Sequence, residues 1–157
     1  MKVTTFLKRE FIIEELKATT KEAALAELAS LLRQAGSPDD HRDEMVKVLM
    51  ARERLGSTGI GDGIAIPHGK ISGIADLMIA IGRSSRGVDF NAMDGKPVHL
   101  FFLLMAPENS SGQHLKVLAR ISRLLKDNIL RNHLMEARSP EEIFNLLVEK
   151  DDLIGLT

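Results

Sequence analysis

The chain has 157 residues, of which 44% are hydrophobic and 27% charged, and its formal net charge is −1. This composition is typical of one folded domain, and the near-zero charge argues against a nucleic-acid or anionic-lipid partner. Because the chain has no cysteine, disulfides, thiolate metal sites and cysteine nucleophiles are excluded. The most apolar run, residues 98–106, is too short to span a bilayer. We therefore expect a cytoplasmic protein that is not embedded in a membrane.

The N-terminal third predicts a strand followed by two helices. Residues 11–16 begin with an apolar run that favours a strand. Thr19 opens a capping box, and the leucines after it have helical spacing as far as Gly36, a C-cap candidate. The Ser-Pro pair at 37–38 predicts the start of a second helix that ends at about Arg54.

The remaining chain predicts a glycine-rich loop, then strands, then helices. The loop covers residues 56–73 and holds six of the 12 glycines. The elements expected after it are strands at 77–81, 86–90 and 98–105, a turn at 94–97, a helix from Ser110 or Ser111 to about Leu125, and a last helix capped by Ser139 with Pro140 in its first turn. Helices and strands alternate irregularly, which predicts an α/β fold: a single domain over residues 1–157, with a mixed parallel and antiparallel sheet flanked by helices.

The glycine loop does not have the residues of a nucleotide-binding loop. After GSTGIG the chain has Asp62 and Gly63, where a phosphate-binding P-loop needs Lys and then Ser or Thr, and the third glycine of a dinucleotide fingerprint is replaced by Ile64. The other notable feature of the loop is a short strand-like run at residues 64–68. Pro67 cannot continue a central ladder.

The same run places a histidine beside the loop. We expect Gly69 to let the backbone turn after His68, so that the imidazole stands at the end of a strand beside loop amides, which bind anions well. Such a histidine can accept a phosphoryl group. On the local sequence alone, an ordinary turn histidine fits equally well.

Residues 52–70, RERLGSTGIGDGIAIPHGK, resemble the phosphorylation-site signature of enzyme IIA of the bacterial phosphotransferase system, fructose/mannitol class. The segment GSTGIG is most similar to the corresponding segment of the nitrogen-regulatory branch. The resemblance implies that His68 is the phosphorylated residue and that His114 and Arg52 complete the active site. Without it, Arg52 fits a surface residue at a helix end, and His114 fits a helix residue beside an apolar face.

The resemblance also implies a donor and a way to hold the phosphoryl group. The donor is a phosphohistidine carrier protein (HPr or its nitrogen-branch homologue), and the isoleucines at 60, 64 and 66 predict a partly apolar surface on which it docks. The phosphoryl oxygens are expected to meet the hydroxyls or amides of Ser57, Thr58, Gly59, Gly61 and Gly69. The resemblance calls for no metal or cofactor, and a zinc site made by His68 and His114 would lack a third ligand. The other histidines, 41, 99 and 133, have no motif around them and are expected to be structural.

Three functions remain open at this point. The first is a regulator whose phosphorylation state is recognised by target proteins. The sequence GSTGIG favours this function. The second is a sugar-transport component that passes the phosphoryl group to a separate IIB chain, since the phosphocysteine of a fructose-class IIB is not in this sequence. The third is a binding module without phosphotransfer, against which the complete set of His68, His114 and Arg52 argues.

Overall fold

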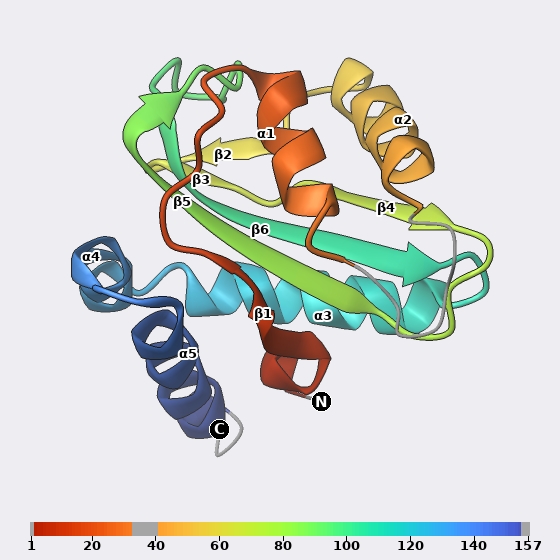
Figure 1. The fold of residues 1–157 in the computed structure, drawn as a ribbon. Coiled ribbons are helices and arrows are strands. Elements are labelled where there is room, and N and C mark those ends of the chain that lie inside the picture. The colour runs from red at the N-terminus through yellow and green to blue at the C-terminus, as the bar shows by residue number, and fades with distance from the viewer. Residues whose placement is uncertain (1, 33–40, 155–157) are drawn as a thin grey trace.

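The computed structural model describes residues 2–32 and 41–154 and has a sheet with helices on both faces (Figure 1). The predicted α/β fold with a mixed sheet is confirmed. In the described part the order is a 3-10 helix Val3–Phe6, β1 Leu7–Ile13, α1 Lys21–Ala29, α2 Arg42–Arg54, β2 Gly59–Gly61, β3 Ile64–Ala65, β4 His68–Ile71, β5 Met78–Val88, β6 Val98–Pro107, α3 Ser111–Leu124, α4 Asn128–Glu136 and α5 Pro140–Ile154.

Strand β6 is the centre of the sheet. It pairs antiparallel with β5 on one side, and β1 continues the sheet parallel to β5. On its other side β6 pairs in parallel first with β3 and then with β4, while β2 pairs antiparallel with β3. Pro67 falls between β3 and β4, and His68 resumes the ladder opposite Leu104. The interruption by proline therefore places His68 at the first residue of a strand, and the prediction that it ends one is wrong.

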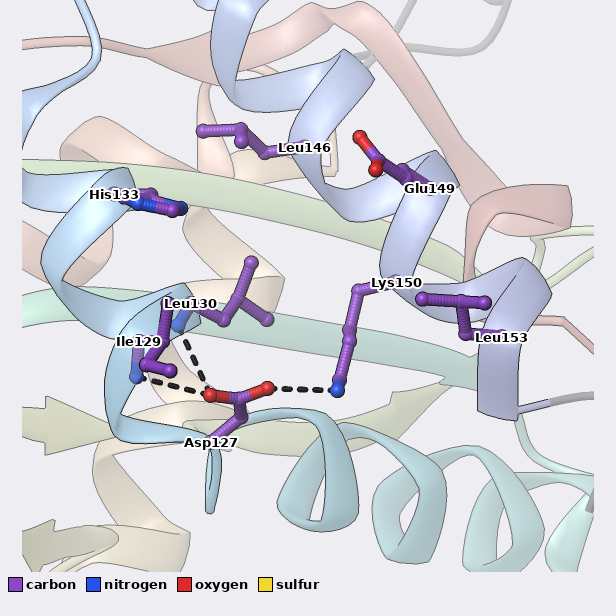
Figure 2. A pocket seen from close by; sticks show the side chains of 8 residues that line it. All are labelled: Asp127, Ile129, Leu130, His133, Leu146, Glu149, Lys150 and Leu153. Carbon is purple, nitrogen blue, oxygen red and sulfur yellow. Dashed lines mark hydrogen bonds and ion pairs between the residues drawn. The ribbon is translucent and has the colours of Figure 1, made fainter.

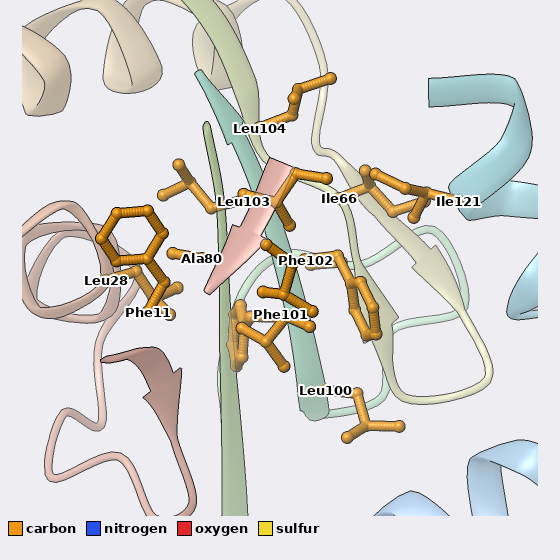
Figure 3. Packing of buried hydrophobic residues seen from close by; sticks show 14 of the residues in the cluster. Phe11, Leu28, Ile66, Ala80, Leu100, Phe101, Phe102, Leu103, Leu104 and Ile121 are labelled. Atoms are coloured by element: carbon orange, nitrogen blue, oxygen red, sulfur yellow. The ribbon is translucent and has the colours of Figure 1, made fainter. Parts of the chain in front are cut away.

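The core lies on both faces of β5 and β6. Helices α1 and α2 cover one face and α3 covers the other (Figure 1). Consecutive residues of β6, including Phe101, Phe102 and Leu103, are fully buried among side chains from other strands and helices (Figure 3). A strand covered on both faces has no polar side to alternate with, which explains its continuous apolar run.

The predicted bounds in the N-terminal half need correction. The first strand begins at Leu7 and ends at Ile13. The N-cap of α1 is Thr20 and not Thr19, because the Thr20 hydroxyl accepts the amide of Ala23, three residues on. The end of α2 at Arg54 is confirmed, whereas the caps expected at residues 36–38 lie outside the described residues.

In the C-terminal half, the strands predicted at 77–81 and 86–90 are one strand, β5. The pairing with β6 is irregular between Arg83 and Val88, so the polar middle of β5 lies in a bulge and the strand resumes its pairing at Val88. Helix α4 was not predicted, and α3 buries His114 but leaves Leu115 exposed. The last helix begins as predicted at Pro140, with the Ser139 hydroxyl accepting the amide of Glu142.

Candidate functional site

His68 begins β4, where the chain re-enters the sheet after Pro67. Its Nδ1 lies 2.8 Å from the carbonyl oxygen of Ile66, and since a carbonyl oxygen can only accept, Nδ1 carries the ring proton. Nε2 is therefore the nitrogen with a free lone pair. Burial lowers the pKa of His68 below 6.5; the Ile66 carbonyl and the negative charge of Glu53 oppose this shift, and the positive charge of Arg52 adds to it. The imidazole is consequently neutral at pH 7, as a nucleophile must be.

His114 comes from the first turn of α3 and lies beside His68. The two ring centroids are 5.5 Å apart and the ring planes are inclined by 54°. His114 is only 6% exposed, and its Nε2 has no hydrogen-bond partner among the residues that the structure describes. Burial, followed by the charges of His68 and Lys70, lowers the pKa of His114 to about 4. A buried polar nitrogen left unpaired beside His68 is suited to contact a group bound there.

Arg52 lies in the last turn of α2, between this helix and the glycine loop. One of its terminal nitrogens donates to the carbonyl of Gly56 at 2.8 Å, which fixes the side chain across the turn that leaves the helix. Its positive charge acts on the pKa of His68, so the guanidinium lies within electrostatic range of the imidazole. A guanidinium has five N–H donors in a planar fork, which suits it to phosphoryl oxygens.

Ser57 and Thr58 use their hydroxyl protons within the protein. The Ser57 hydroxyl donates to the carbonyl of Phe90 at 2.8 Å and accepts the amide of Gly59 at 3.0 Å. The Thr58 hydroxyl and amide both donate to the carboxylate of Glu53, and Thr58 is 4% exposed. These contacts shape the loop. Direct contact of either residue with a phosphoryl group stays a prediction.

The glycines of the predicted site stand where a side chain has no room or the backbone is unusual. A Cβ on Gly59 would lie 2.9 Å from the Ala92 backbone, and Gly61 has φ +99°. The expected turn after His68 is wrong, because Gly69 continues β4 in the ladder. It is instead a packing glycine: a Cβ there would lie 2.7 Å from Cγ1 of Val48 on α2. Contacts of Gly59, Gly61 and Gly69 with a phosphoryl group remain predictions.

Lys70 was not predicted to belong to the site. It lies two residues after His68 on the same strand, so both side chains project from the same face. Its Nζ donates to the hydroxyl of Ser111 at the start of α3, at 2.7 Å, and its charge lowers the pKa of His114. The expected turn after His68 hid this residue, because only a strand that continues past His68 places Lys70 on the same face.

The expected apolar surface around the site has different residues from those predicted. Ile64 and Ile66 are buried, and of the three isoleucines only Ile60 is exposed. Leu55, directly after α2, is 85% exposed, and Leu115, next to His114, is 65% exposed. Leu55 lies three residues after Arg52 and Leu115 directly after His114, so the two leucines supply apolar surface to the end of α2 and the start of α3.

Comparison with known proteins identifies the family. A family model described as "Phosphoenolpyruvate-dependent sugar phosphotransferase system, EIIA 2" matches residues 5–150. The chain belongs to this family. A nitrogen regulatory protein of Bradyrhizobium diazoefficiens is 40% identical to this EIIA chain over 147 residues, which are 94% of the chain and 95% of the relative.

Two further similarities cover both branches of the family. The fructose-specific EIIABC component of Bacillus subtilis is 38% identical over 151 residues, which are 96% of this chain but 24% of that protein. The crystal structure of the nitrogen regulatory protein IIA-Ntr from Neisseria meningitidis matches with a TM-score of 0.84 and 36% identity, covering 92% of this chain and 98% of that one. This EIIA chain is thus a phosphoryl carrier of the phosphotransferase system.

The EIIA chain also has a pocket of about 200 Å³ between α4 and α5, which includes none of the predicted site residues (Figure 2). Its lining residues are Asp127, Ile129, Leu130, His133, Leu146, Glu149, Lys150 and Leu153. Asp127 pairs with Lys150 at 2.7 Å and accepts the amides that begin α4. Its carboxylate is therefore engaged in capping α4 and joining it to α5.

Within residues 2–32 and 41–154, no three or more His, Asp or Glu side chains are grouped so that they could hold a metal ion. None of the described helices is long and apolar enough to cross a membrane. Nδ1 of His99 lies 2.8 Å from the carbonyl of Ser84, which fits the structural role expected of it.

Proposed function

We propose that this chain accepts a phosphoryl group on Nε2 of His68 from a phosphohistidine carrier protein of the HPr type, and that its phosphorylation state regulates target proteins. One observation carries the proposal. The proton of His68 is held on Nδ1 by the Ile66 carbonyl, which leaves Nε2 free beside the buried, unpaired nitrogen of His114. A transferase reaction in this site needs positioning and charge stabilisation more than covalent help.

The transfer is balanced without an outside acid or base. The lone pair on Nε2 of His68 forms the new P–N bond, and the old P–N bond breaks with its electron pair returning to the donor imidazole. Each ring keeps the proton on its other nitrogen, which in His68 is the Nδ1–H held by Ile66. Since one P–N bond replaces another, we expect the reaction to be nearly thermoneutral and reversible.

The cations and the second histidine have separate tasks in this proposal. Arg52 contacts the phosphoryl oxygens through the N–H groups that Gly56 does not use. Neutral His114 places its unpaired Nε2 against the same group. Lys70, held at the start of α3 by Ser111, adds positive charge on the face of the sheet that carries His68.

A regulatory role is our first choice among the functions of the family. This choice rests on the loop sequence GSTGIG and on the relative named nitrogen regulatory protein, which matches over nearly its whole length. Transfer to a separate IIB chain is the second candidate, because a fructose-specific EIIABC component is almost as similar. A binding module without phosphotransfer is disfavoured, since it would not need a free Nε2 beside Arg52 and His114.

The acceptor is tested by intact mass after incubation with a phosphorylated HPr-type carrier. The wild type should gain one phosphoryl group and lose it in acid, because P–N bonds are acid-labile. His68→Ala should gain nothing, whereas His133→Ala, at an exposed histidine of α4, should behave as the wild type. Unchanged phosphorylation of His68→Ala would refute the assignment.

The branch is tested by comparing two donors and one acceptor. Faster uptake from the phosphorylated nitrogen-branch carrier than from the sugar-branch carrier supports the regulatory role. Rapid loss of the phosphoryl group to a cysteine-containing IIB chain would instead assign the chain to sugar transport.

A further inference from the structure

Glu53, the residue after Arg52 on α2, has a buried carboxylate beneath the glycine loop. Its side chain is only 3% exposed and pairs with Nζ of Lys21 from α1 at 3.0 Å. The same carboxylate accepts the Thr58 amide at 3.1 Å and the Thr58 hydroxyl. Helix α1 and the glycine loop, which are far apart in the sequence, thus both contact the Glu53 side chain.

The contacts continue from Thr58 to the phosphoryl acceptor. The carbonyl of Thr58 accepts the amide of Ile66 at 3.0 Å, and the carbonyl of Ile66 accepts Nδ1–H of His68 at 2.8 Å. Between Glu53 and the His68 ring, the path runs through backbone groups alone after the Thr58 side chain. Hydrogen bonds therefore connect the Glu53 carboxylate to the carbonyl that fixes the His68 tautomer.

A second set of contacts holds the same loop from the side of α1. Nζ of Lys21 lies 4.6 Å from the ring centroid of Phe90, and the Phe90 carbonyl accepts the Ser57 hydroxyl. Lys21 thus touches both the carboxylate that holds Thr58 and the residue that holds Ser57. Thr58 is therefore held by Glu53, and Ser57 by Phe90, which packs against the Lys21 partner of Glu53.

We propose that Glu53, fixed by Lys21, is a positioning residue for phosphoryl transfer, which holds His68 in the Nδ1–H tautomer through Thr58 and Ile66. The inference rests on the proposed role of His68 as acceptor. Stability alone is a weak reason for such a pair, because the desolvation of two buried charges roughly cancels their attraction. A fixed loop geometry, in contrast, uses both carboxylate oxygens, one for the amide of Thr58 and the other for its hydroxyl.

The first test replaces Glu53 with Gln, which keeps the shape but loses the charge and one acceptor. The rate of phosphoryl uptake from a phosphorylated HPr-type carrier should fall by about tenfold to a hundredfold, as expected when a reacting group is misplaced. Glu15→Gln is the matched control, since Glu15 accepts the amide and hydroxyl of Ser85 in the same way but at an exposed position. Its rate should equal that of the wild type.

The second test reads the tautomer directly, by nitrogen NMR of the His68 ring in unphosphorylated protein. The wild type should show Nδ1–H alone, and Glu53→Gln should show a mixture with Nε2–H. Thr58→Val, which replaces the hydroxyl with a methyl group, should shift the tautomer in the same direction, whereas Thr58→Ser, which keeps a hydroxyl, should show the wild-type tautomer. If Glu53→Gln does not fold, Thr58→Val and Thr58→Ser test the positioning role instead.

Each outcome has a defined meaning. A slower rate with a shifted tautomer supports the positioning role. A wild-type rate, or a slow rate with an unchanged tautomer, in folded Glu53→Gln or Thr58→Val overturns it. If the wild type itself takes up no phosphoryl group, the proposed function fails, but the tautomer measurement needs no donor and still tests Glu53 separately.

Discussion

At the scale of single residues, the site combines two neutral imidazoles with cations that are held by neighbouring polar groups. Replacing Arg52 with Ala removes a charged contact worth roughly 1.5–3 kcal/mol, so phosphoryl uptake should slow by about tenfold to a hundredfold. Arg54→Ala, at an exposed arginine two residues on, is the control and should leave the rate unchanged. Rates come from quenched-flow mass measurement with a phosphorylated HPr-type carrier, and a wild-type rate in Arg52→Ala would remove Arg52 from the site.

His114 should make the stability of the protein depend on pH. Burial lowers its pKa from 6.5 to about 4, so between these values the unfolded chain binds a proton that the folded protein does not. The free energy of unfolding therefore falls as the pH drops below about 6.5 and levels off below about 4. At 1.36 kcal/mol for each pKa unit, the loss from this group is about 3 kcal/mol.

Urea unfolding at pH 7 and pH 4 measures this loss. His114→Gln should lose about 3 kcal/mol less than the wild type between the two values, whereas His133→Gln should lose as much as the wild type. Equal pH dependence of His114→Gln and the wild type would contradict the buried, neutral state of His114.

The resemblance of residues 52–70 to a family signature pointed to His68, Arg52 and His114, and the structure places the rings of His68 and His114 side by side. The sequence could not predict the engagement of Thr58, whose partner Glu53 is itself paired with Lys21, 32 residues earlier. Nothing local in a sequence tells which buried carboxylate will meet which hydroxyl. For the same reason Ser57 and Thr58 had to be treated as free loop hydroxyls until their partners were known.

At the scale of elements, the close approach of α2 to β4 depends on Gly69. In Gly69→Ala the new Cβ would lie 2.7 Å from Cγ1 of Val48, and the overpacking should cost about 1–3 kcal/mol. Because α2 carries Arg52 and β4 carries His68, separation of the two elements should also slow phosphoryl uptake. Both effects are measured on the same variant, by urea unfolding and by the uptake rate.

The control for Gly69 is a double mutant. Adding Val48→Ala removes the clashing methyl group, so Gly69→Ala should cost less in that background than in the wild type. Gly112→Ala provides a second comparison, since a Cβ there meets nothing within 4 Å and should stabilise helix α3 by up to about 1 kcal/mol. Equal costs of Gly69→Ala in the two backgrounds would contradict the proposed clash.

A cap predicted the start of α5 correctly, whereas the cap expected at Thr19 was one residue early. Ser139 with Pro140 predicted the start of α5 because serine and proline have defined tasks there. Helix α4 was missed because only Leu130 and Leu134 among its residues are buried, too few for a clear period. Strand β5 was divided in two because Arg83 to Gly87 has the composition of a turn, whereas in the structure the strand continues through a bulge and pairs with β6 on both sides of it.

At the scale of the whole molecule, the irregular alternation of helices and strands predicted a mixed sheet but not its strand order. The position of β3 and β4 along one edge of β6 depends on pairing between distant segments, which local patterns do not encode. This pairing brings His68 alongside β6, directly before the turn into α3 that carries His114. The fold therefore assembles the site from two segments 46 residues apart, a distance that follows from their numbers.

Phosphorylation should change how the molecule binds its regulatory targets. It adds about −1.5 to −2 charges at one point of a chain whose net charge is −1. A target that docks over His68 and the exposed Leu55 and Leu115 would have to bury a strongly hydrated dianion. Burial of an unpaired charge is costly, so we expect the unphosphorylated protein to be the form that binds.

Titration calorimetry with a target captured by the unphosphorylated chain tests this expectation at fixed salt. Phosphorylated protein should bind more weakly, and His68→Glu should have a smaller effect, because one carboxylate supplies only part of the phosphoryl charge. His133→Glu places the same charge on α4 and should leave the affinity unchanged, which separates a local effect at the site from the overall charge. Equal affinities of the phosphorylated and unphosphorylated forms would mean that the phosphoryl group does not control binding, and tighter binding of the phosphorylated form would point to a target that offers an arginine cluster to the dianion.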